Sequence, residues 1–111
     1  MEIIKKFPND MDARTLVKLM KSPEVKKMSD AEDSVLEVKA WLLFKSEDNS
    51  GDKREVLVIE TVDGEMFATI SEIFKKEFAG LIEYLGDDIG EIKVVSGKSR
   101  AGRKFITCSI F

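Results

Sequence analysis

Apolar residues at helical spacing follow the first proline of the chain. Asn9 and Asp10 are candidate N-caps after Phe7-Pro8, and the apolar positions behind them are Ala13, Leu16, Val17 and Met20. Gaps of three and four residues are typical of an amphipathic helix. Ser22-Pro23 predicts its end, because the residue before a proline disfavours the helical conformation. The charged stretch 24–33 predicts a connector, so residues 1–33 form an N-terminal helical arm.

The pattern then changes from helical to alternating. From Val35 to Lys45, one face carries the apolar set Leu36, Val38, Ala40, Leu42 and Phe44. A period of two predicts a strand, and it places Trp41 on the opposite, more polar face. Residues 46–53, with Asn49 among them, are polar and predict a loop.

A hairpin is predicted next. The β-rich runs 55–62 and 65–70 are separated by Asp63-Gly64, a strong signal for a two-residue turn. Such a turn sets Ile59 opposite Ala68 and Glu60 opposite Phe67. We therefore expect one apolar side, and we expect Phe67 on the other side. The apolar side is made of Leu57, Ile59, Met66, Ala68 and Ile70.

A second helix and a second hairpin complete the chain. Ser71 is placed to cap a helix over residues 71–85, which Gly86 ends. Strands are predicted at 91–96 and 104–111. The aromatic residues expected in the core or at its edge are Phe44, Phe74, Phe78 and Tyr84.

The order of these elements predicts the fold class. Three strands, a helix and two strands are the β-β-β-α-β-β order of a five-stranded antiparallel OB-like barrel, here preceded by an N-terminal helix. The expectation is one mainly β domain over residues 1–111, with the barrel in 34–111. An open α+β sheet with the helix on one face uses the same elements and remains an alternative.

Composition narrows the function classes. The chain has 111 residues, 43% of them hydrophobic and 35% charged, no histidine and one cysteine. Histidine is the commonest general base and transition-metal ligand near neutral pH, so we expect a non-enzymatic protein without metal or cofactor. The charged start of the chain and the short apolar runs predict a cytoplasmic protein.

Charge is unevenly distributed. The formal net charge is −3, which argues weakly against a nucleic-acid partner. From Lys93 to the end, however, there is no acidic residue. The basic residues there are Lys93, Lys98, Arg100, Arg103 and Lys104. We take these five as candidate phosphate contacts, and a solvated hairpin tip is the alternative.

Three aromatic residues are candidates for stacking on bases. Alternation points Trp41, Phe67 and Phe105 away from the apolar face of their strands. Stacking suits single strands, because every base presents a π-face whatever the sequence. The alternative is that both faces of a strand are covered, in which case a ring belongs to the core.

The residues from 31 to 111 resemble a known family. The Asp63-Gly64 hairpin followed by Phe67 and Ile70-Ser71, and the strand end Lys93-Val94-Val95 with Gly97, are similar to the small single-stranded-DNA-binding proteins of protein-primed phages of Gram-positive bacteria. The resemblance implies a protein that coats and protects single-stranded DNA during replication, with phage or host replication proteins as further partners. The binding aromatics of that family are typically tyrosines, whereas this chain has Phe67 at the hairpin position.

Two functions are therefore compared. The first is sequence-tolerant binding of single-stranded DNA through the basic and aromatic residues named above. The second is a protein-interaction module, an adaptor or host-directed inhibitor, that uses the acidic region 47–88 to engage a basic partner.

Overall fold

The structure is a computed structural model that describes residues 2–47 and 50–110; Asn49 of the predicted loop and the predicted strand end at Phe111 lie outside them. In this part of the chain the strands are β1 (Glu2–Phe7), β2 (Lys26–Lys27), β3 (Val35–Glu47), β4 (Lys53–Thr61), β5 (Met66–Thr69), β6 (Glu91–Lys98) and β7 (Lys104–Ile110). The helices are α1 (Ala13–Lys21) and α2 (Glu72–Leu85), with the 3₁₀ turns η1 (Met28–Ala31) and η2 (Gly86–Asp88).

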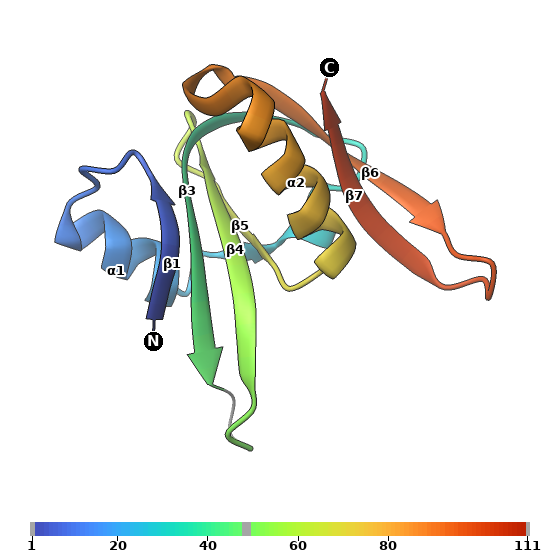
Figure 1. Cartoon of the computed structure of the whole chain (residues 1–111), viewed down its shortest axis with the longest axis horizontal. Helices are drawn as coiled ribbons and strands as arrows, with labels where there is room; N and C mark the ends of the chain where they lie inside the picture. Colours follow the sequence, from blue (N-terminus) through green and yellow to red (C-terminus); the bar gives the residue numbers. More distant parts are fainter. Residues whose placement is uncertain (1, 48–49, 111) are drawn as a thin grey trace.

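Strand β3 is the centre of the sheet. Its later part pairs with β4 on one side and with β1 on the other, whereas its first three residues pair with β6. The order β2-β5-β4-β3-β6-β7 curls into a half-barrel with α2 in its hollow (Figure 1). The prediction of a mainly β, OB-like fold with two helices is thus confirmed at this level. Within the described residues no ladder joins β5 to β7, so this side of the sheet is open.

The N-terminal segment contains more than the predicted helix. β1 pairs with β3, β2 pairs with β5 in parallel, and η1 contributes the buried side chains of Met28 and Ala31. Neither Asn9 nor Asp10 caps α1. Asp12 does, because its carboxylate accepts a 2.7 Å hydrogen bond from the backbone N–H of Thr15.

A bulge in β3 corrects the prediction for Trp41. The β3–β4 register shifts by one residue between Val38 and Ala40. Such a bulge moves every later side chain to the other face. Leu36 therefore shares its core with Trp41. The residues Ala40, Leu42 and Phe44 lie on the opposite face and pack with residues of α1.

The register of the β4–β5 hairpin corrects the prediction for Phe67. Ile59 pairs with Phe67, and not with Ala68. The loop has three residues, because the N–H of Thr61 donates to the carbonyl of Glu65 and the N–H of Gly64 donates to that of Thr61. Gly64 has φ +87°, which is the left-handed position of a three-residue loop. The extra residue turns Phe67 into the core beside Ile59.

Helix α2 fills the half-barrel. Ser71 caps it as predicted, by accepting a 3.2 Å hydrogen bond from the N–H of Phe74. Phe74 and Phe78 are buried in the core, but Tyr84 is 88% exposed, which corrects its expected core position. The buried rings of Phe74 and Phe78 thus belong to the side of α2 that faces the core, and Tyr84 lies outside it. No helix in the described ranges is long and apolar enough to cross a membrane.

Candidate nucleic-acid interface

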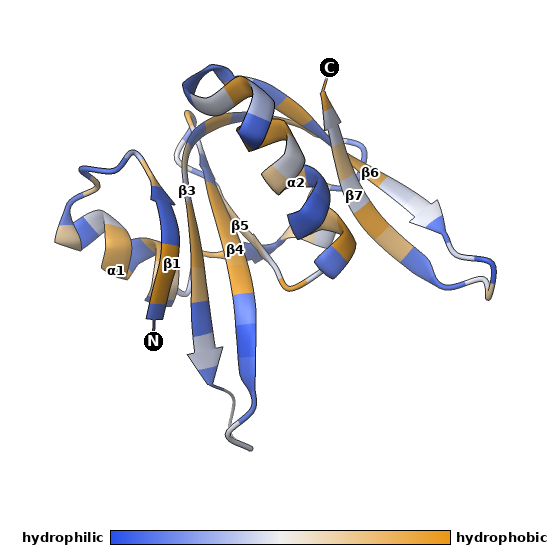
Figure 2. Ribbon diagram, viewed as in Figure 1, coloured by the Kyte–Doolittle hydropathy of each residue, from blue (hydrophilic) through white to orange (hydrophobic). Residues whose placement is uncertain are grey.

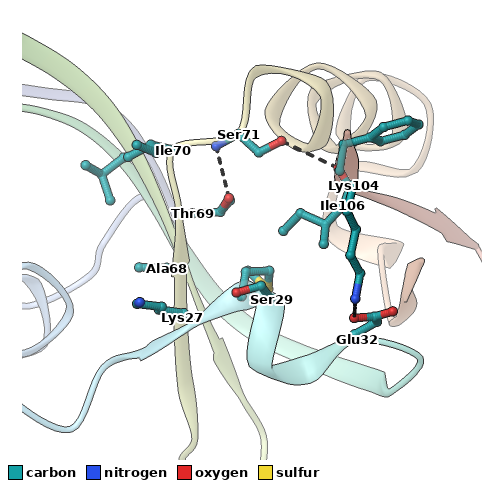
Figure 3. Close-up of a pocket in the computed structure, with 12 residues that line it drawn as sticks. Lys27, Ser29, Glu32, Ala68, Thr69, Ile70, Ser71, Lys104 and Ile106 are labelled. Atoms are coloured by element: carbon teal, nitrogen blue, oxygen red, sulfur yellow. Dashed lines mark hydrogen bonds and ion pairs between the residues drawn. The ribbon is translucent and has the colours of Figure 1, made fainter. Parts of the chain in front are cut away.

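A groove of about 670 Å³ follows the open side of the sheet. Its walls are the end of β5 and the start of α2 on one side, β7 on the other, and η1 between them (Figure 3). The lining combines apolar side chains with the charged groups of Lys27, Glu32 and Lys104. Such a combination suits a nucleic-acid strand, which has apolar base faces and charged phosphates. The residues that line it are Lys27, Met28, Ser29, Glu32, Val56, Ala68, Thr69, Ile70, Ser71, Lys104, Phe105 and Ile106.

Polar contacts cross this groove at two places. At one end the Ser71 hydroxyl donates a 3.5 Å hydrogen bond to the carbonyl of Ile106. At the other end the ammonium group of Lys104 forms an ion pair with Glu32 (Figure 3). Hydrogen bonds from Lys104 and then Ser96 lower the pKa of the Glu32 carboxyl. The carboxylate is therefore ionised at neutral pH.

The basic hairpin tip is a tight turn. The N–H of Ser99 donates to the carbonyl of Arg103, the N–H of Gly102 donates to that of Ser99, and Gly102 has φ +81°. The loop has three residues and the same hydrogen-bond pattern as the loop between β4 and β5. It leaves Arg100 and Arg103 exposed, and the ladder continues at once with Lys98 opposite Lys104. Four cations thus lie around one turn, at a strongly hydrophilic end of the molecule (Figure 2).

Phe105 lies across the backbone of Gly97, its partner in the ladder. A Cβ atom on Gly97 would be 2.7 Å from Cζ of the Phe105 ring. The ring is half-buried, so part of its surface stays available. Lys93 alternates with the buried Ile92 and Val94, which puts it on the same face of the hairpin as Phe105. The two positions are about 13 Å apart along the hairpin, since Lys93 pairs with Ser109.

The other two aromatic candidates do not reach the groove. Trp41 and Phe67 are 6% and 5% exposed. Trp41 makes an edge contact with Phe78 at 5.6 Å between ring centroids, and the ammonium of Lys26 covers Phe67 at 5.6 Å. A base needs a free ring face for stacking, so in this structure both rings serve the core.

Comparison with known proteins separates the two functions. The family model described as phage single-stranded DNA-binding protein matches residues 12–111. The chain belongs to this family. Single-stranded DNA is thus the partner of the protein, and phage replication is its setting. No curated protein and no solved structure matches the chain.

In this phage single-stranded DNA-binding protein, some groove residues had no signal in the sequence. Lys27, Ser29 and Glu32 fall in the charged stretch read as a connector with room for a helical turn, and η1 is such a turn. The adjacent lysines Lys26 and Lys27 were the one available hint. They lie beside β5 because β2 pairs with β5 in parallel, and no local sequence pattern predicts this pairing.

The groups that could bind a metal or react are the acidic side chains and the thiol of Cys108. Within residues 2–47 and 50–110, no group of three or more His, Cys, Asp or Glu side chains could hold a metal ion. Cys108 is buried, and burial raises the pKa of its thiol to about 12. The family itself is one of DNA-binding proteins.

Proposed function

We propose that the single strand of DNA lies in the groove between β5 and β7 and continues around the basic tip of the β6–β7 hairpin. The observation that carries this proposal is the position of Lys104, which lines the groove and is also part of the tip. An OB-type fold binds oligonucleotides across its second and third strands, between the loops that join strands one to two and four to five. Here those strands are β4 and β5, and the second of those loops is the basic tip.

Phosphate contacts come from two faces of the hairpin. Lys98 and Lys104 lie opposite each other in the β6–β7 ladder, and Lys104 lines the groove with Ile106. Arg100 and Arg103 extend from the turn, and Lys93 lies farther along the outer face. Such contacts carry no sequence information, which is what a protein that coats single strands requires.

Base contacts come from fewer rings than the sequence suggests. Phe105 is the candidate ring with accessible surface beside the cations, and Ile70, 49% exposed, adds apolar surface in the groove. We infer that the protein binds displaced strands in this OB-type groove, in the host cytoplasm. Binding there protects them while replication proceeds.

The test is a titration of fluorescein-labelled oligo-dT, followed by anisotropy at several salt concentrations. Each phosphate contact contributes about 0.7 to the slope of log K against log salt. K98Q, R100Q, R103Q and K104Q should each weaken binding and lower this slope by about that amount. F105A should cost about 1–3 kcal/mol for the base it stacks on.

A matched control is K76Q. Lys76 is exposed on α2 and does not line the groove, while its loss changes the net charge equally. It should bind as the wild type does. Equal weakening by K76Q and K104Q would show that the groove has no special role, and failure of the wild type to bind oligo-dT at low salt would overturn the function itself.

A further inference from the structure

Among the groove-lining residues of the described chain there is one carboxylate, that of Glu32. It forms an ion pair with Lys104, the lysine that belongs to both the groove and the basic tip. Glu32 follows η1, its side chain is 27% exposed, and it pairs with Lys104 across the open side of the sheet (Figure 3). The free protein therefore presents Lys104 already neutralised.

A phosphate group and Glu32 compete for the same donor. The ammonium group of Lys104 can serve both only if the two anions approach each other, and like charges repel at such distances. The Lys104 side chain is 60% exposed, so water screens its pair with Glu32 and the pair is weak. A DNA phosphate can thus displace the carboxylate at modest cost.

We propose that Glu32 is an internal competitor for the phosphate site at Lys104, which must release this lysine before the DNA backbone binds there. The inference rests on the proposed function, since it concerns the same groove. It gives Glu32 the role of limiting affinity, so that a coated strand is released more readily than the basic residues alone would allow.

A purely structural role makes the opposite prediction. The pair also joins η1 to β7, two elements without a shared ladder in the described residues. If its purpose were to hold the groove in shape, its loss would loosen the binding site and weaken DNA binding. The sign of the effect of Glu32→Gln on affinity therefore separates the two roles.

The experiment is a double-mutant cycle on the full chain with labelled oligo-dT. E32Q should bind about two- to fivefold more tightly at low salt, the range that a weak exposed ion pair allows. The gain should shrink as salt screens the pair, so E32Q should show the steeper salt slope. In the K104Q background E32Q should change nothing, because no ammonium is left to release.

The control variant for E32Q is E83Q. E83Q makes the same change of net charge on the exposed face of α2 and should leave affinity unchanged. Wild-type or weaker binding by E32Q, or a gain that persists beside K104Q, would overturn the role of Glu32 while leaving DNA binding intact. Absence of binding by every variant and by the wild type would instead remove the proposed function.

Discussion

Ile59 and Phe67 lie directly opposite each other in the β4–β5 ladder, and both side chains are buried in the core under α2. This pairing exists because Gly64 adds a third residue to the hairpin loop. A two-residue loop would have placed Phe67 one position away and on the other face. The ring is thus part of the core of the half-barrel, 5% exposed.

The first prediction concerns the stability contributed by Phe67. Replacing it by alanine should lower the free energy of unfolding by about 3–5 kcal/mol, because a fully buried ring leaves a cavity. Urea denaturation followed by circular dichroism measures this. F105A is the matched control, and its smaller cost should follow from its half-buried ring. If F67A were as stable as the wild type but bound oligo-dT more weakly, the result would show that Phe67 contacts DNA.

A second prediction uses Trp41 as a probe of its surroundings. Because the ring is 6% exposed and packs on Phe78, iodide should quench its fluorescence weakly in the folded protein and strongly in urea. Saturating oligo-dT should leave the emission maximum in place, since the ring is buried beside α2. Quenching of the folded protein as strong as that of free N-acetyltryptophanamide would contradict the buried position.

The errors of the sequence-based analysis have a common origin. The elements from β3 to β7, the capping of α2 by Ser71 and the basic turn follow local patterns and were predicted, whereas β1 and β2 were not. The faces of Trp41 and Phe67 were wrong because each depends on one inserted residue, in the β3 bulge and in the Gly64 loop. Alternation counts residues and does not detect such an insertion. Strand β1 was not predicted, because the sequence Ile3-Ile4-Lys5-Lys6 does not alternate between apolar and polar residues.

The third prediction concerns the contact of Gly97 with Phe105. G97A should displace the Phe105 ring, because the new Cβ would be 2.7 Å from Cζ. The affinity of G97A for oligo-dT should then fall toward that of F105A. The free energy of unfolding should decrease only by the strain that the new Cβ introduces into the β6–β7 hairpin. Gly80→Ala is the control: nothing lies within 4 Å of its Cβ position in α2. Helix propensity predicts a gain of up to about 1 kcal/mol there, with binding unchanged.

The fourth prediction concerns Cys108 and pH. Burial, followed by the charge of Glu77, raises the pKa of the thiol to about 12 from 9.0. Ellman's reagent at pH 8 should therefore react only after unfolding. Because the folded state keeps the proton longer than the unfolded state, this contribution to stability is complete below pH 9 and is lost as pH rises toward 12. Rapid labelling of the native protein would show that β7 opens locally.

The fifth prediction concerns the ion pair that attaches α1 to the sheet. Lys18 donates at 2.9 Å to Glu60, whose side chain is 5% exposed. K18M should cost about 1–3 kcal/mol of unfolding free energy, toward the lower value because Lys18 itself is 44% exposed. Adding E60L should recover much of the loss, since no buried charge then lacks a partner. E65Q, which breaks an exposed pair, should change stability by less than about 0.5 kcal/mol.

The short strand β1 has a consequence for the behaviour of many copies at close range. It covers the edge of β3 from Lys45 to Trp41, and all of it lies before residue 12, where the family match begins. Its own outer edge carries Lys5 and Lys6, and its ladder is interrupted between Ile3 and Lys5. Charged and bulged edges resist the addition of a foreign strand. Copies of the protein bound side by side on one DNA strand should therefore not pair edge to edge into continuous sheets.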